Sequence, residues 1–224
     1  MSRSTFTPTV LRWTAALAAA LSLSACAPLV LGTAVGGAFV ATDRRTSGMQ
    51  LEDQTIKIKA GNRIRDALKD RGHVNVHAYN RMVLLTGEVP TDADRAAAAA
   101  AAEQTENVSG VVNELIVGLN STISSRSSDL LVATKVRATL VDARDVMSNA
   151  FDVVVERGDV YLMGMVTERE ANRVAELVST ISGVRRVVKV FQIISEDELA
   201  RKLPRQASPA SPASPAASQS STQP

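Results

Sequence analysis

The sequence predicts an α+β protein built from two tandem units, each a helix-strand-strand-helix-strand unit whose small mixed sheet packs on helices. Two observations predict this class. Residues 51–118 and 128–195 repeat one another, and within each copy the apolar pattern switches between the period of a helix and that of a strand. Units of about 70 residues bury only about 60% of their unfolded surface. We therefore expect the two units to pack against each other.

The repeat is clearest at the second strand of each unit. Residues 83–89 (VLLTGEV) correspond to residues 160–166 (VYLMGMV) at an offset of 77 residues. Upstream, Ile64 corresponds to Val136 at an offset of 72 residues. The second unit therefore has about five extra residues before its first strand, since the two offsets differ by that amount.

In the first unit, four apolar residues share one face of the opening helix: Ile56, Ala60, Ile64 and Ala67. Residues 74–79 then alternate between apolar and polar, as a half-buried strand does. A tight turn at residues 80–81 leads into the second strand, residues 82–89. The next helix contains seven consecutive alanines, residues 96–102, which favour a helix but bury little volume. We expect this helix to lie very close to its sheet or to the neighbouring helix.

In the second unit, the corresponding turn is at residues 157–158, and the second helix opens with residues 167–170 (TERE). This tetrapeptide predicts a capping box, in which the Thr167 and Glu170 side chains each bind a backbone N–H of the other residue. Gly87 and Gly164 end the second strand of each unit. A glycine there indicates a bend or a close approach of two backbones.

The start of the chain has the three zones of an export signal. Residues 1–25 contain a basic start, an apolar core and small residues before a cleavage site, and Cys26 follows as the only cysteine of the chain. In lipoprotein signals of this kind the thiol receives diacylglycerol, so Cys26 is the predicted lipidation site and residues 26–50 a lipidated tether. Ala27 follows, where lipoproteins kept in the inner membrane usually carry Asp. An outer-membrane, lipid-anchored location facing the periplasm is therefore predicted.

Composition excludes one class of partner. Without residues 1–25 the chain holds 23 basic and 23 acidic residues and no tryptophan. Nucleic-acid-binding proteins usually show a basic excess and stacking aromatics, so no nucleic-acid partner is predicted. Residues 119–127 are predicted as a linker. Residues 196–224 are predicted as a disordered tail, because a segment dominated by Pro, Ala and Ser cannot bury enough surface to offset its ordering entropy.

The residues that perform chemistry do not form a recognisable arrangement in the sequence. His73 and His77 are the only histidines, and two ligands without a third His, a Cys or convergent carboxylates do not make a zinc site. No nucleophile motif or Gly-rich phosphate loop is present. The sequence therefore predicts no metal, no cofactor, no small-molecule substrate and no enzymatic activity.

The opening helix of the second unit provides a candidate binding surface. Placing Ala133, Val136 and Leu140 toward the core turns Leu131 toward water. Apolar side chains beside cations suit the headgroup region of an anionic membrane. The predicted phospholipid-binding residues are Leu131, Thr134, Lys135, Arg137, Ala138 and Val141. Two alternatives remain open, which are that the other unit buries Leu131 or that it is an ordinary exposed leucine.

Four segments carry a family resemblance. The strand ends at residues 85–89 (LTGEV) and 162–166 (LMGMV), the helix start at residues 167–171 (TEREA) and the segment 182–188 (SGVRRVV) closely resemble the BON domain. Two copies behind a lipoprotein signal resemble the outer-membrane lipoproteins with two BON domains. The resemblance implies a periplasm-facing protein that supports envelope integrity, with domains that engage phospholipid and perform no chemistry.

The leading hypothesis is therefore a lipid-anchored, phospholipid-binding protein that maintains the outer-membrane barrier. The main alternative is a non-enzymatic adaptor whose exposed helix face and sheet edges recruit envelope proteins, such as assembly or cell-wall machinery. A periplasmic enzyme is a weaker third hypothesis. Binding to protein-free vesicles distinguishes the first hypothesis from the second.

Overall fold

A computed structural model of the chain describes residues 43–69 and 71–202. The predicted signal (1–25), Cys26, the apolar part of the tether (28–41) and most of the predicted tail (203–224) lie outside the described residues.

The first unit has the predicted order of elements, with its last strand in two pieces: α3 (Ser47–Leu68), β1 (His73–Tyr79), β2 (Met82–Val89), α4 (Asp92–Glu103), β3 (Gly110–Asn113) and β4 (Ile116–Val117). β1 pairs antiparallel with β2, and β2 pairs in parallel with β3 and β4. The sheet is therefore mixed, as predicted.

The second unit repeats this order and ends with an additional helix: α5 (Ile123–Asp142), the short 3₁₀ helix η2 (Ser148–Ala150), β5 (Phe151–Glu156), β6 (Asp159–Val166), α6 (Glu168–Ser179), β7 (Arg186–Ile193) and α7 (Glu196–Lys202). β6 lies between an antiparallel β5 and a parallel β7. The predicted capping box is present at the start of α6, where the Thr167 hydroxyl accepts from the Glu170 N–H and the Glu170 carboxylate accepts from the Thr167 N–H.

The structure differs from the predicted boundaries at three places. α3 begins at Ser47, within the predicted tether, because the Thr46 hydroxyl caps the Met49 N–H. α5 begins at Ile123, within the predicted linker, where Thr122 supplies the same kind of cap. The prediction of disorder for residues 196–202 is wrong, because these residues form α7 and Leu199 of α7 is buried between the two units.

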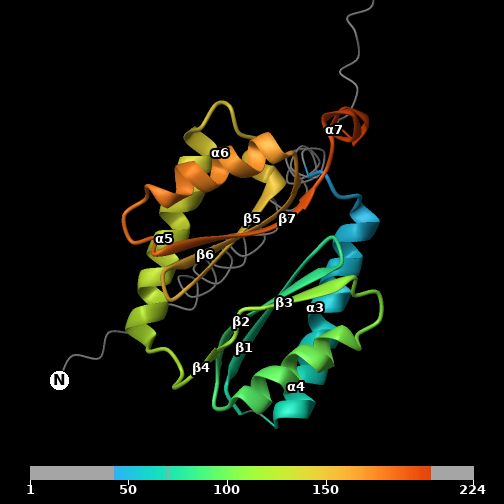
Figure 1. Cartoon of the computed structure of the whole chain (residues 1–224), viewed down its shortest axis with the longest axis vertical. Helices are drawn as coiled ribbons and strands as arrows, with labels where there is room; N and C mark the ends of the chain where they lie inside the picture. Colours follow the sequence, from blue (N-terminus) through green and yellow to red (C-terminus); the bar gives the residue numbers. More distant parts are fainter. Residues whose placement is uncertain (1–42, 70, 203–224) are drawn as a thin grey trace, which may run out of the picture.

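The two sheets face each other and the helices cover their outer sides, so the molecule has four layers (Figure 1). The alternation of side chains along β2 shows how this arises. Val83, Leu85 and Val89 pack under α3 and α4, whereas Leu84 points toward the sheet of the other unit. Because both sides of β2 are buried, its first four residues, 82–85, are all apolar, and Thr86 and Glu88 further along the strand are buried as well. β6 shows the same division, with Leu162 beneath α5 and α6.

The cluster between the sheets joins the two units into one body. Its buried members are Tyr79, Leu84, Val154, Tyr161, Met163, Met165, Val190, Ile194 and Leu199. Each fully buried large apolar side chain contributes roughly 1.5–3 kcal/mol. The expectation that the two small units pack against each other is thereby confirmed.

Candidate functional site

The outer side of α5 carries exposed apolar side chains, as the helical pattern predicted. Leu131 is 65% exposed and Val141 is 69% exposed, and Thr134 and Ala138 lie on the same exposed side. The other unit does not bury Leu131, because the two units meet through their sheets.

The two predicted cations of α5 lie on opposite flanks of the helix. The Lys135 ammonium donates to the Ser182 backbone carbonyl at 3.3 Å and to the Ser182 hydroxyl at 3.1 Å, so it lies toward the loop that precedes β7. The Arg137 guanidinium donates to the Val153 carbonyl at 2.9 Å, so it lies toward β5. The structure therefore gathers Leu131, Thr134, Lys135, Ala138 and Val141 on one side and places Arg137 at its edge.

Sequence reasoning missed two residues of this helix. Ile123 is 83% exposed and Leu130 is 65% exposed, and Leu130 lies on the flank that carries Arg137. The internal repeat could have drawn attention to these two residues. At the offset of 72 residues, Ile123 and Leu130 correspond to Leu51 and Ile58 of the first unit. Those two residues of α3 are exposed as well.

Arg44 and Arg45, just before α3, form hydrogen bonds that connect the N-terminal segment to both units. The Arg44 guanidinium forms two hydrogen bonds with the Glu170 carboxylate, at 2.7 and 2.9 Å, and donates to the Met165 carbonyl at 2.8 Å. Burial alone would raise the pKa of Glu170, but the hydrogen bonds and charge of Arg44 outweigh burial and lower it. Arg44 therefore connects the start of the first unit to the N-terminus of α6.

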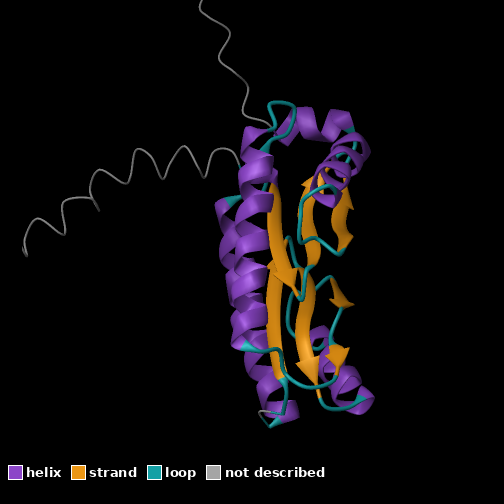
Figure 2. Cartoon of the chain, turned by 90° about the vertical axis from the view of Figure 1, so that its left-hand side faces the viewer, coloured by secondary structure: helices purple, strands orange, loops and turns teal. Residues whose placement is uncertain are grey.

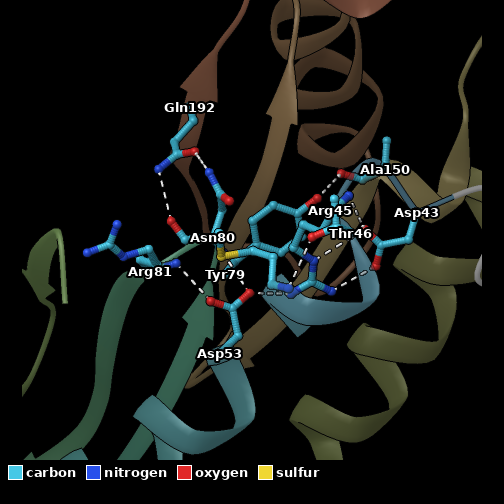
Figure 3. Close-up of polar contacts among 10 residues, drawn as sticks. Asp43, Arg45, Thr46, Asp53, Tyr79, Asn80, Arg81, Ala150 and Gln192 are labelled. Atoms are coloured by element: carbon cyan, nitrogen blue, oxygen red, sulfur yellow. Dashed lines mark hydrogen bonds and ion pairs between the residues drawn. The ribbon is translucent and has the colours of Figure 1, made fainter. Parts of the chain in front are cut away.

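Arg45 makes a second set of contacts, with the first unit itself (Figure 3). Its guanidinium lies 4.0 Å from the centre of the Tyr79 ring and donates to Asp43 and Asp53, each at 2.9 Å. A cation over an aromatic face is attracted by the ring quadrupole. Burial raises the pKa of Tyr79 to about 12, so the phenol stays neutral, and its hydroxyl lies 3.5 Å from the Ala150 carbonyl of the second unit.

Asp53 also holds the hairpin turn between β1 and β2 (Figure 3). Its carboxylate accepts from the backbone N–H groups of Asn80 and Arg81, both at 2.8 Å, and both turn residues have positive φ. Asp129 of α5 does the same in the second unit, where it accepts from Arg157 and Gly158 at 2.8 Å. Each opening helix thus carries one buried aspartate that fixes its own hairpin turn.

These contacts bring the N-terminal segment to the edge of the α5 surface. A cavity of about 450 Å³ is bordered by Asp43 and Arg45 on one side and by Arg137 and Val141 of α5 on the other. The chain that leads from the predicted lipid anchor therefore reaches the folded body beside the last turn of α5.

The described residues contain no group of three or more His, Cys, Asp or Glu side chains placed to hold a metal ion. His73 and His77 both lie on β1, and burial lowers the pKa of His77. None of the described helices has the length and apolar character needed to cross a bilayer.

The family model of the BON domain matches residues 52–118 and 128–195. The chain belongs to the BON domain family. It is 39% identical over 181 residues to the "Outer membrane lipoprotein DolP" of Haemophilus influenzae, a match that covers 80% of this chain and 93% of that protein. It is also 31% identical over 154 residues to the "21 kDa hemolysin" of Actinobacillus pleuropneumoniae, covering 68% of this chain and 79% of that protein.

These findings confirm the predicted family and α+β fold class. The BON-domain protein is of the DolP type and is an outer-membrane lipoprotein of the cell envelope. The roles of Cys26 and of the α5 residues remain predictions.

Proposed function

We propose that this BON-domain lipoprotein binds anionic phospholipid of the outer membrane through α5, while an acylated Cys26 holds it at the bilayer. In this way it supports envelope integrity, and the proposed role is binding without catalysis. The observation that carries the proposal is the exposed side of α5, where Leu131 and Val141 stand 65% and 69% exposed beside cationic side chains.

The binding free energies expected from apolar insertion and from charge attraction are modest, so we expect α5 to act together with the lipid anchor. A large aliphatic side chain contributes roughly 1.5–3 kcal/mol when it is fully buried, and insertion at an interface buries only part of it. Each cation near an anionic membrane adds about 1 kcal/mol. α5 alone would therefore bind reversibly. An anchor raises the effective concentration of the bilayer beside the helix, which makes a modest intrinsic affinity sufficient.

The position of the N-terminal segment is consistent with this arrangement. Asp43 and Val141 border the same cavity, so the tether begins next to the proposed binding surface.

The test uses the mature chain with Cys26→Ser, so that no acyl group contributes, and vesicles with and without phosphatidylglycerol. Cosedimentation should show binding that rises with the anionic lipid fraction and weakens as salt screens the charges. Leu131→Glu with Lys135→Glu should lower the vesicle affinity tenfold or more. The matched control is Ile193→Glu with Lys189→Glu on β7, which changes the charge equally at another exposed site. Equal binding by both variants would remove α5 from the mechanism, and retention only by envelope proteins would favour an adaptor.

A further inference from the structure

The two long helices carry exposed aliphatic side chains at equivalent positions of the repeat. Leu51 and Ile58 of α3 are 70% and 61% exposed, and their counterparts Ile123 and Leu130 of α5 are 83% and 65% exposed. Single exposed aliphatic residues need no explanation. An exposed aliphatic pair that recurs at the same spacing in both units does need an explanation. Packing does not provide one, because these residues contribute little to the core of either unit.

The two helices border one groove. A cavity of about 560 Å³ has Lys57 of α3 on one side and Leu130 and Arg137 of α5 on the other, with residues of β1 and β5 between them. β1 and β5 each form one edge of their sheet, and Figure 2 shows the long helices lying along one side of the strands. In α5 the groove is lined by Arg126, Leu130, Ala133 and Arg137, which are spaced by three or four positions, and by the buried Asp129.

The corresponding stripe of α3 contains Ile58. Gln54, Gly61 and Arg65 line smaller cavities on the β1 side of α3, and Ile58 falls between them at helical spacing. Leu51 lies one heptad before Ile58. The exposed aliphatic residues of both helices are therefore inclined toward the same side of the molecule.

The charge of this side favours an anionic partner. Over their whole length α3 and α5 carry seven Lys and Arg residues against five Asp and Glu residues. The charged residues that line the groove itself are Lys57, Arg126 and Arg137, with Asp129, Asp152 and Glu156. Within the described part of the chain, Lys57, Arg126 and Arg137 form no ion pair; Arg126 donates to the Ser121 hydroxyl and Arg137 to a carbonyl.

The acidic side chains in the groove are largely engaged. The Asp129 carboxylate is occupied by the two N–H groups of its turn. Burial raises the pKa of Glu156, whose carboxylate accepts from the Asn75 amide at 3.1 Å. Asp152 remains as the exposed carboxylate beside three cations.

We infer that α3 and α5 contact one anionic lipid surface together, with Leu51 and Ile58 of the first unit inserting alongside Ile123 and Leu130 of the second. The inference rests on the proposed phospholipid binding, but it assigns part of the contact to the first BON domain. The tether enters on this side too, since Asp43 borders a cavity with Arg137. The groove between the helices then faces the headgroups.

Tryptophan reporters test this directly, because Trp13 lies in the predicted signal and the mature chain contains no other tryptophan. Ile58→Trp, Leu130→Trp and, as a control, Ala97→Trp on the exposed side of α4 are prepared in the mature Cys26→Ser chain. On phosphatidylglycerol vesicles that contain brominated lipid, the emission at positions 58 and 130 should shift to the blue and be quenched, and that at position 97 should not change.

A charge variant gives the second measurement. Leu51→Glu with Ile58→Glu should weaken vesicle binding about tenfold, whereas Ala97→Glu with Ala100→Glu on α4 changes the charge equally and should have a clearly smaller effect. Thermal unfolding confirms that each variant is folded. A response at position 130 without one at position 58 would overturn the inference and leave the proposed function intact. No response at either position, with no binding to vesicles, would overturn both.

Discussion

Arg44 and Glu170 form a buried pair at 2.7 Å although 126 residues separate them in the chain. Their side chains are 2% and 11% exposed. The pair joins the residues that precede the first domain to the N-terminal turn of α6 in the second. It therefore stabilises the arrangement of the two domains as well as the helix that Glu170 caps.

Arg44→Ala should lower the free energy of unfolding by about 3–5 kcal/mol, because it leaves the Glu170 carboxylate buried without its cation. Urea denaturation measures this change. Arg95→Ala, which removes an exposed pair with Asp92 on α4, is the control and should cost no more than about 0.5 kcal/mol. Equal costs for the two variants would show that the buried pair is not a stabilising contact.

The stabilisation by Arg44 should depend on pH. The pKa of Glu170 is lowered in the folded protein from a reference value of 4.5, so its contribution is complete above that value and is lost as the pH falls through the folded pKa. Without Arg44, burial raises the pKa of Glu170, so the difference in unfolding free energy between the wild type and Arg44→Ala should be largest near neutral pH. It should shrink as the pH falls toward and through the lowered pKa that Glu170 has in the wild type. A difference that persists unchanged to pH 3 would contradict this assignment.

Asp53→Ala and Asp129→Ala should each destabilise the protein by about 1–3 kcal/mol, because each leaves two N–H groups of a hairpin turn without their acceptor. Amide hydrogen exchange should show faster exchange at the turn that lost its aspartate and little change at the other. Asp66→Ala and Asp142→Ala remove exposed aspartates from the same two helices and serve as controls.

Gly87→Ala should be strongly destabilising, by roughly 3 kcal/mol. Gly87 has a φ of +112°, and a Cβ there would lie 2.0 Å from the His73 carbonyl oxygen. Gly61→Ala in α3 is the opposite case, since a Cβ meets nothing within 4 Å and alanine favours a helix by about 0.5–1 kcal/mol. The two melting temperatures should therefore move in opposite directions from that of the wild type.

The repeat made most of the fold predictable. A pattern that occurs in both copies marks the positions of the helices, strands and turns in each. The hairpin turns predicted in this way at residues 80–81 and 157–158 are present. The close approach expected at the strand glycines is also found, since a Cβ at Gly164 would lie 2.5 Å from the Ala150 carbonyl oxygen. The strands continue past both glycines to Val89 and Val166.

The contacts between distant segments were less accessible. A run of charged residues before α3 does not indicate that Arg44 pairs with Glu170 and Arg45 with Asp53, because the partners are set by the packing of the two sheets. Residues 196–202 contain one large apolar side chain, Leu199, and directly precede the segment rich in Pro, Ala and Ser whose composition predicts disorder. In the structure Leu199 joins the cluster between the sheets, and Glu196 of this helix lies 3.6 Å from Arg169 of α6.

On α5, the helical period correctly predicted the exposed side but not its extent. The predicted binding residues begin at Leu131, whereas the exposed apolar side chains of α5 also include Ile123 and Leu130. Arg137 flanks this side, as the helical period predicts, but the pattern does not show that its guanidinium turns to the Val153 carbonyl. A side chain as long as arginine reaches around a helix, and its direction depends on the acceptor that it finds.

The segment from Asp43 to Thr46 also determines how mechanical load would travel through the molecule. If Cys26 carries the predicted lipid anchor, a pull on that anchor would reach this segment before it reached α3. Since Arg44 is bound to one domain and Arg45 to the other, the force would be divided between them instead of unwinding the first turn of a helix. The two domains would then move together with the membrane as one rigid body.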